Sequence, residues 1–149
     1  MLRTIFVVLL TGLLLPGCGS DSETCDVSIG PTADVQERLQ TALIEIQPDS
    51  TLCREEGTYL FSTELSLSVD NVTVRGAGMD KTILDFTMQD LGANGLHITS
   101  DGVTLEDFQV LDPPGDGIRA SDVDGIIFRN LKVIWTADES TESGTYGLY

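Results

Sequence analysis

A five-residue phrase occurs three times in this chain. Its first and third positions are apolar, its fourth is charged, and its fifth is a residue type common in turns. The copies are VTVRG at 72–76, VTLED at 103–107 and IIFRN at 126–130. They start 31 and 23 residues apart. A second phrase, which centres on a glycine, alternates with the first as NGLHI at 94–98, DGIRA at 116–120 and YGLY at 146–149. Self-similarity at this period predicts an architecture of stacked repeats.

The apolar residues of each phrase lie two positions apart, as in Val72 and Val74. This is the period of a β-strand with one buried face. One repeat cannot cover its own apolar side, whereas repeats stacked at strand spacing align Val72, Val103 and Ile126 in one interior column. We therefore predict an all-β fold, a right-handed parallel β-helix.

The last position of the first phrase holds Gly76, Asp107 and Asn130. These residue types are enriched where the backbone turns through the left-handed region. We expect a turn of that kind at all three positions.

The first 17 residues have the form of a secretory signal peptide, with an apolar run at 5–15 that is followed by Pro16 and Gly17 before Cys18. The segment resembles the lipobox of bacterial lipoproteins, in which the cysteine becomes the lipidated first residue. An ordinary signal peptide with an incidental Cys18 is the alternative. Gly19, rather than Asp, implies the outer membrane. We expect a lipid-anchored protein of the bacterial cell envelope that meets the membrane only through its anchor.

Residues 18–31 are expected to hold the lipidated cysteine and a polar tether. Residues 32–47 carry Val35, Leu39 and Leu43 at helical spacing, which predicts an amphipathic helix that caps the first coil. Partner binding is the alternative role for this helix. The β-helix is expected over 48–149. Because the chain stops inside a recurring phrase, we expect the natural β-helix to continue further.

Two cysteines, Cys25 and Cys53, remain beyond the signal segment. An even pair in an exported protein favours a disulfide, and two buried free thiols are the alternative.

The charge balance restricts the partners. The chain has 24 acidic and 8 basic residues and no cluster of Lys or Arg, which disfavours nucleic acid. A polysaccharide or an envelope protein is the expected partner.

Strand alternation predicts one outward column of polar side chains. If the residues beside it point inward, His97 points out, and the repeat spacing places Arg119 and Tyr149 in the same column. Asn94 and Asp116 precede the glycines of this column. Such a stripe could hydrogen-bond sugars or pair with uronate carboxylates through Arg119, although a chance arrangement is the alternative.

The sequence offers no catalytic constellation. It shows no Ser-His-Asp order and no metal-spaced His/Cys set, and we expect neither a metal nor another cofactor. The acidic pair Asp122 and Asp124 is expected in a turn.

Residues 69–149 resemble the right-handed parallel β-helix repeat proteins of the pectin-lyase-like superfamily. The helix followed by EEGTY at 55–59, VTVRGAG at 72–78 and TILD at 82–85 is similar to the opening of such domains in polysaccharide lyases, pectinesterases and alginate C5-epimerases. The resemblance implies action on acidic polysaccharide along one solenoid face. The Asp-Pro-His-Asp motif of the epimerases is absent, however, and the calcium constellation of pectate lyases cannot be placed. We expect a non-catalytic scaffold that binds glycan or a partner. The alternative is the N-terminal part of a carbohydrate-active enzyme similar to a polysaccharide lyase or mannuronan C5-epimerase.

Overall fold

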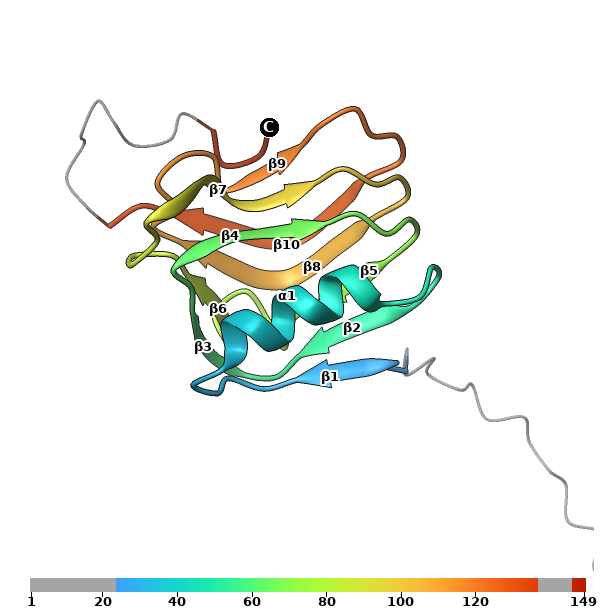
Figure 1. The fold of residues 1–149 in the computed structure, drawn as a ribbon, viewed down its shortest axis with the longest axis horizontal. Helices are drawn as coiled ribbons and strands as arrows, with labels where there is room; N and C mark the ends of the chain where they lie inside the picture. Colours follow the sequence, from blue (N-terminus) through green and yellow to red (C-terminus); the bar gives the residue numbers. More distant parts are fainter. Residues whose placement is uncertain (1–23, 137–145) are drawn as a thin grey trace, which may run out of the picture.

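The structure is a computed structural model, and it describes residues 24–136 and 146–149. It is β-rich, with one short helix, α1 (Val35–Glu45), in the part described (Figure 1). The strands are β1 (Val27–Ile29), β2 (Thr51–Arg54), β3 (Gly57–Leu60), β4 (Thr63–Leu67), β5 (Thr73–Arg75), β6 (Thr82–Asp85), β7 (Leu91–Ile98), β8 (Thr104–Leu111), β9 (Ile118–Ala120) and β10 (Ile127–Ile134). No helix among these residues is both long and apolar enough to cross a membrane. The predicted signal peptide and Cys18 lie outside the described residues.

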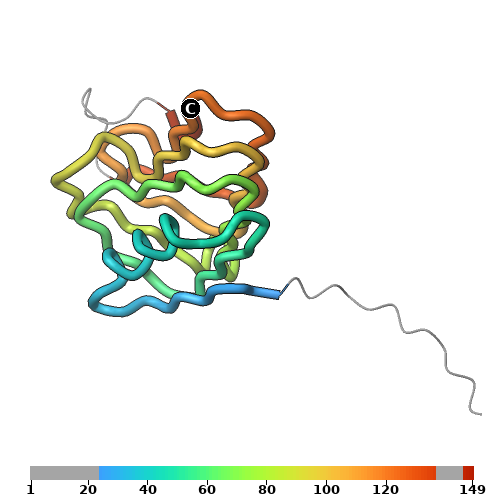
Figure 2. The backbone as a smooth tube through the Cα atoms, turned by 45° about the vertical axis from the view of Figure 1, so that its right-hand side comes forward, coloured from blue at the N-terminus to red at the C-terminus, as the bar shows by residue number. Residues whose placement is uncertain are grey.

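All strand pairings between these elements are parallel. A seven-stranded sheet has the order β1-β2-β5-β8-β6-β3, with β10 also paired to β8, and a three-stranded sheet has the order β4-β7-β9. The chain passes from the large sheet to the small one three times, by β3 to β4, β6 to β7 and β8 to β9. Figure 2 shows these passes lying one above another from the N-terminal to the C-terminal end.

The long strand β8 bends in the middle and serves two neighbours. Its first half pairs with β5 and its second half with β6. The bend is at Asp107, which has a φ of 61°, and β10 repeats it at Asn130 with a φ of 46°. The predicted left-handed turn is therefore confirmed at these two positions.

The same prediction is wrong for Gly76, which is not among the residues with positive φ. Glycine is required there for a different reason. A Cβ on Gly76 would lie 2.1 Å from the carbonyl oxygen of Asp107 in the neighbouring strand. The residue allows a close approach of two backbones rather than an unusual dihedral angle.

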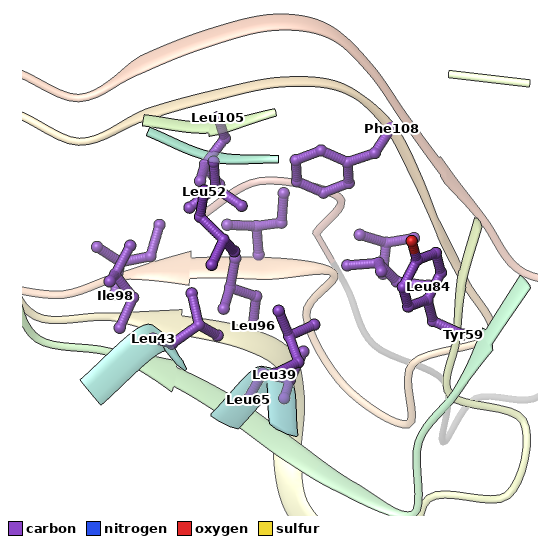
Figure 3. Packing of buried hydrophobic residues seen from close by; sticks show 14 of the residues in the cluster. Leu39, Leu43, Leu52, Tyr59, Leu65, Leu84, Leu96, Ile98, Leu105 and Phe108 are labelled. Carbon is purple, nitrogen blue, oxygen red and sulfur yellow. The ribbon is translucent and has the colours of Figure 1, made fainter. Parts of the chain in front are cut away.

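The phrases of the sequence align in register in the core. Val74 pairs with Leu52 and with Leu105, and Leu105 pairs with Phe128. The predicted column of Val72, Val103 and Ile126 also forms. Its first two members are fully buried, and Ile126 packs partly buried against the core. Figure 3 shows the aliphatic and aromatic side chains that fill the space between the sheets and α1. Strand alternation thus correctly predicted the buried face.

The helix α1 lies within the predicted range 32–47 and buries Val35, Leu39 and Leu43. It contacts β1, β3 and β4, so its apolar stripe covers the N-terminal end of the core.

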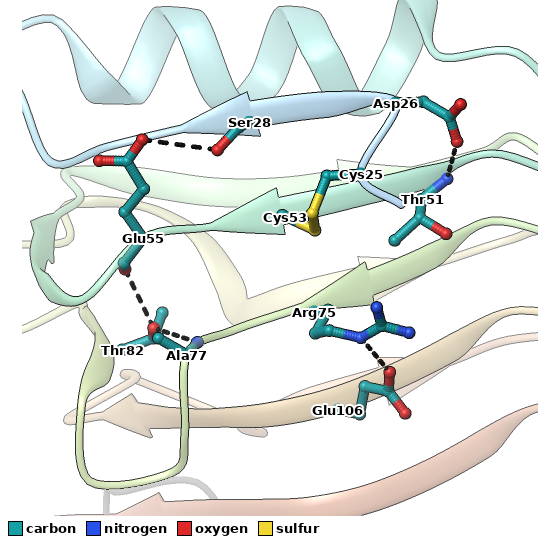
Figure 4. Close-up of a disulfide and its surroundings, with 10 residues drawn as sticks. All are labelled: Cys25, Asp26, Ser28, Thr51, Cys53, Glu55, Arg75, Ala77, Thr82 and Glu106. Atoms are coloured by element: carbon teal, nitrogen blue, oxygen red, sulfur yellow. Dashed lines mark hydrogen bonds and ion pairs between the residues drawn. A yellow bond between two sulfur atoms is a disulfide. The ribbon is translucent and has the colours of Figure 1, made fainter. Parts of the chain in front are cut away.

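The segment before the helix differs from the prediction of a tether through residue 31. Residues 27–29 form β1, which pairs with β2, and Cys25 forms a disulfide with Cys53 at a Cα–Cα distance of 5.6 Å (Figure 4). The predicted cysteine pair is therefore present. Val27 and Ile29 supply the apolar alternation that makes this segment a strand, and its pairing with β2 also satisfies backbone groups.

Candidate functional site

The candidate site lies on the outer side of the sheet β4-β7-β9. Leu96 and Ile98 of β7 are buried, and His97 between them points outward with a side chain 30% exposed. Parallel pairing places Ser66 and Arg119 on either side of His97. The repeat spacing had predicted this proximity of His97 and Arg119.

Arg119 also has the two other partners that the sequence placed near it. Its guanidinium carbon lies 4.9 Å from the centre of the Tyr149 ring, and its Nη1 lies 3.6 Å from Asp116 Oδ2. The backbone N–H of Tyr149 donates a hydrogen bond to the carbonyl of Ile118, which holds Tyr149 beside β9. The Arg119 side chain is still 41% exposed, so a ligand can reach it from solvent. We name His97, Asp116, Arg119 and Tyr149 the binding column.

Asn94 does not belong to the outward column, contrary to the sequence prediction. Its relative exposure is only 7%, and its side-chain amide donates to Glu64 Oε2 at 2.8 Å. The strict alternation of outward and inward residues fails here, because Asn94, Gly95 and Leu96 are buried in succession. Asn94 supports Glu64 instead of facing a ligand.

Glu64 is a residue of this site that sequence reasoning missed. Its Oε2 accepts hydrogen bonds from the backbone N–H groups of Ala93 and Asn94 and from the Asn94 amide. Its Oε1 lies 3.7 Å from His97 Nδ1. The register between β4 and β7 shifts between Thr63 and Leu65, so residue spacing alone did not place Glu64 beside His97.

Ser121 is the second missed residue. Its Oγ lies 3.1 Å from His97 Nε2 and 3.4 Å from Arg119 Nε. It is half-buried at the end of β9, and its own N–H donates to the carbonyl of Ile98. The serine is diagonal to His97 rather than in the same cross-strand row, which a search for a repeat spacing does not detect. We name Glu64, His97 and Ser121 the polar triad.

No family model, curated protein or solved structure matches this chain. The geometry of the site is therefore the main guide to its chemistry. Among residues 24–136 and 146–149, no group of three or more His, Cys, Asp or Glu side chains is arranged to hold a metal ion. Asp122 and Asp124 both lie at the exposed turn after β9, and Asp122 has a φ of 55°.

Two open grooves lie away from the binding column. The larger, of about 650 Å³, lies between β1 and α1 and is lined by residues that include Ile29, Arg38 and Ile46. The smaller, of about 330 Å³, is lined by residues that include Pro31 and Leu60. Neither groove includes a residue of the binding column or of the polar triad.

A buried cation lies inside the core, at Arg54. Its side chain is almost fully buried, and burial lowers its pKa to about 9. Its Nε and Nη2 have no hydrogen-bond partner among the described residues, while its guanidinium carbon lies 3.9 Å from the centre of the Phe108 ring. The repeated phrases begin after this position, so no repeat pattern indicated that Arg54 would point inward.

Proposed function

We propose that this chain is a cell-envelope lipoprotein with a right-handed parallel β-helix domain of the pectin-lyase-like kind. The parallel pairing of every strand, the in-register recurrence of the phrases and the passes between two sheets support this fold. The lipobox-like end of the signal segment at Cys18 supports the lipid anchor. Incorporation of labelled palmitate that is lost in a Cys18→Ser variant is the test of the anchor, and incorporation that persists in that variant contradicts it.

The function that the site supports best is binding of an acidic polysaccharide along the outer face of β4-β7-β9. The observation that carries it is the exposed contact of Arg119 with Tyr149, with His97 next to Arg119 in register. An arginine pairs with carboxylates by two parallel hydrogen bonds, and an aromatic ring presents an apolar face to a sugar. His97, Arg119 and Tyr149 follow one another across the strands of the sheet, which suits an extended polymer.

Arg119 is a local positive charge on a strongly acidic protein. The chain has a formal net charge of −16, so an acidic polymer is repelled by most of its surface. Arg119 therefore supplies a local attraction that has to overcome this repulsion. Its pairing with Asp116 at 3.6 Å holds the guanidinium in place and also lowers its net attraction for anions. We expect weak binding that depends on salt concentration.

Affinity electrophoresis of the protein in gels that contain polygalacturonate or alginate tests this proposal, with a neutral glucan as the control polymer. We expect retardation by the uronates alone and at least a tenfold loss of affinity in Arg119→Ala. Lys81→Ala is the matched control, because Lys81 is an exposed cation whose partner Glu56 lies outside the column. Equal losses of uronate affinity in the two variants, or no uronate binding by the unsubstituted protein, would contradict the proposal.

An enzyme acting on polysaccharide is the second candidate function. The polar triad is the specific observation in its favour, because it brings a hydroxyl and a carboxylate to opposite sides of one imidazole ring.

A further inference from the structure

We propose that Ser121 is the nucleophile of a hydrolytic site in which His97 is the base and Glu64 positions it. The substrate is an acyl ester carried by the polymer that lies along the binding column. The choice of polymer rests on the proposed function, whereas the choice of nucleophile rests on the geometry of the polar triad alone.

The two ring nitrogens of His97 face different partners. Glu64 Oε1 lies 3.7 Å from Nδ1, and Ser121 Oγ lies 3.1 Å from Nε2. A carboxylate on the Nδ1 side favours the neutral tautomer with its proton on Nδ1. The Nε2 lone pair is then free to accept the hydrogen bond of the Ser121 hydroxyl. A nucleophile, a base and a group that orients the base are thus in the order that serine hydrolysis requires.

Glu64 is held more firmly than a surface carboxylate. Three N–H donors, two from the backbone at Ala93 and Asn94 and one from the Asn94 side chain, bind its Oε2 at 2.8 to 3.2 Å. The side chain is only 20% exposed. With Oε2 fixed in this way, Oε1 stays directed at His97, which is the task of a positioning residue.

Arg119 supplies positive charge beside the nucleophile. Its Nε lies 3.4 Å from Ser121 Oγ, so an oxyanion that forms on a carbon bonded to Oγ comes within reach of the guanidinium. A donor placed in advance where negative charge develops lowers the barrier of acyl transfer. The same arginine therefore serves the binding column and the polar triad.

The openness of the site restricts the substrate. His97 is 30% exposed and Ser121 is half-buried, and neither of the two grooves described above reaches them. A small free ester would have little surface to bind. An acyl group on an extended polymer gains its affinity from neighbouring units that lie along the sheet, and its carbonyl carbon is then presented to Ser121.

The reaction balances with water as the only co-reactant. Ser121 Oγ attacks the carbonyl carbon while His97 Nε2 takes the hydroxyl proton. The C–O bond to the polymer breaks, and the leaving oxygen receives this proton and departs as an alcohol. Water then attacks the acyl-Ser121 ester and gives a proton to His97, which returns it to Ser121 Oγ as the carboxylic acid leaves.

A fluorophosphonate probe on the full-length chain, followed by mass spectrometry of peptides, tests the nucleophile. We expect label on Ser121, and at least a tenfold loss of labelling rate in His97→Ala. Ser66→Ala is the matched control, because Ser66 is an exposed serine that pairs in register with His97 on its other side. This variant should label at the unsubstituted rate. No label on Ser121, label on Ser66, or an unchanged rate in His97→Ala overturns the proposal, and the first two outcomes need no variant to fold.

Hydrolysis of p-nitrophenyl acetate, an activated ester that reacts without tight binding, tests the role of Glu64 through kcat/KM. We expect Glu64→Gln to lower kcat/KM at least tenfold, and Glu64→Asp to recover part of the loss. Equal kcat/KM in Glu64→Gln and the unsubstituted protein, or no recovery in Glu64→Asp, contradicts the positioning role. Ser121→Ala should keep its retardation by uronate gels. If the unsubstituted protein is labelled on Ser121 but does not bind uronate, the proposed function is overturned and the assignment of the nucleophile is kept.

Discussion

The guanidinium of Arg54 stacks on the ring of Phe108 inside the core, with 3.9 Å between its central carbon and the ring centre. The ring offers a cation–π attraction, but it does not satisfy the Nε and Nη2 groups, which have no hydrogen-bond partner among the described residues. A buried charge without an ionic partner costs more free energy than an apolar side chain of similar length. Arg54 therefore destabilises the folded state.

We expect Arg54→Met to raise the free energy of unfolding by about 2 kcal/mol, because methionine fills the same space without a charge. Urea unfolding followed by circular dichroism measures the change. Arg54→Lys is the control that keeps the charge and loses the planar contact with Phe108, and it should lower stability. A loss of stability in Arg54→Met would show that the guanidinium has a stabilising role in the core.

The pH dependence of stability tests the same residue. Burial lowers the pKa of Arg54 from its usual value to about 9, so above pH 9 the folded state releases a proton that the unfolded state keeps. Stability then rises with pH in this window. The advantage of Arg54→Met over the unsubstituted protein should shrink by about 1 kcal/mol between pH 8 and pH 10. Burial raises the pKa of Tyr59, which acts in the opposite direction at higher pH, so the comparison stops at pH 10. A constant difference across the window contradicts this prediction.

Glu106 lies between two arginines in adjacent strands. Arg75 Nε donates to its Oε1 at 2.5 Å and Arg129 Nη1 to its Oε2 at 3.2 Å. We expect Glu106→Gln to lower the free energy of unfolding by about 2 kcal/mol. The Glu106 side chain is only 7% exposed, and loss of its negative charge leaves the positive charges of Arg75 and Arg129 close together. Most of this comes from Arg75, since the exposed Arg129 is screened by solvent.

The control for this substitution is Glu56→Gln, which removes an exposed carboxylate 3.8 Å from Lys81. Its effect on urea unfolding should stay within about 0.5 kcal/mol. A Glu106→Gln variant as stable as this control would mean that the Arg75–Glu106–Arg129 row contributes nothing net.

Two glycines of the second phrase, Gly95 and Gly117, allow neighbouring strands to approach. A Cβ on Gly117 would lie 2.6 Å from the carbonyl oxygen of Gly147 and 2.5 Å from Val133 Cγ1. We expect Gly117→Ala to cost about 2 kcal/mol by thermal or urea unfolding. Gly147→Ala is the matched control, because its nearest side-chain atom is 3.6 Å away and the substitution should be close to neutral. Similar losses in both variants contradict the steric explanation.

The disulfide between Cys25 and Cys53 ties β1 to β2. It closes a loop with a sequence separation of 28, for which chain entropy predicts a loss of about 3 kcal/mol or slightly more on reduction. Urea unfolding with and without dithiothreitol measures it. A Cys25→Ser/Cys53→Ser variant should have the reduced stability in both conditions. Hydrogen exchange of the Val27–Ile29 amides should also speed up, and unchanged exchange would show that pairing with β2 alone holds this strand.

The sequence by itself determined the strands, their buried faces and much of their alignment. Alternation at two residues predicts which side chains point inward, and a phrase that returns at Val74, Leu105 and Phe128 pairs with itself when parallel strands stack. The spacing of the second phrase likewise brought His97, Arg119 and Tyr149 together. These features depend on local periodicity, which is visible in the order of residues.

Only the tertiary structure decided the polar triad and the inward position of Arg54. Glu64 reaches His97 because the pairing of β4 with β7 is irregular, and Ser121 reaches it along a diagonal. Asn94 turns inward where alternation fails. Such contacts depend on register shifts and side-chain reach between distant strands, which no repeat spacing records. The periodicity of the sequence determines which strands pair, whereas the polar triad forms where the strand pairing departs from that periodicity.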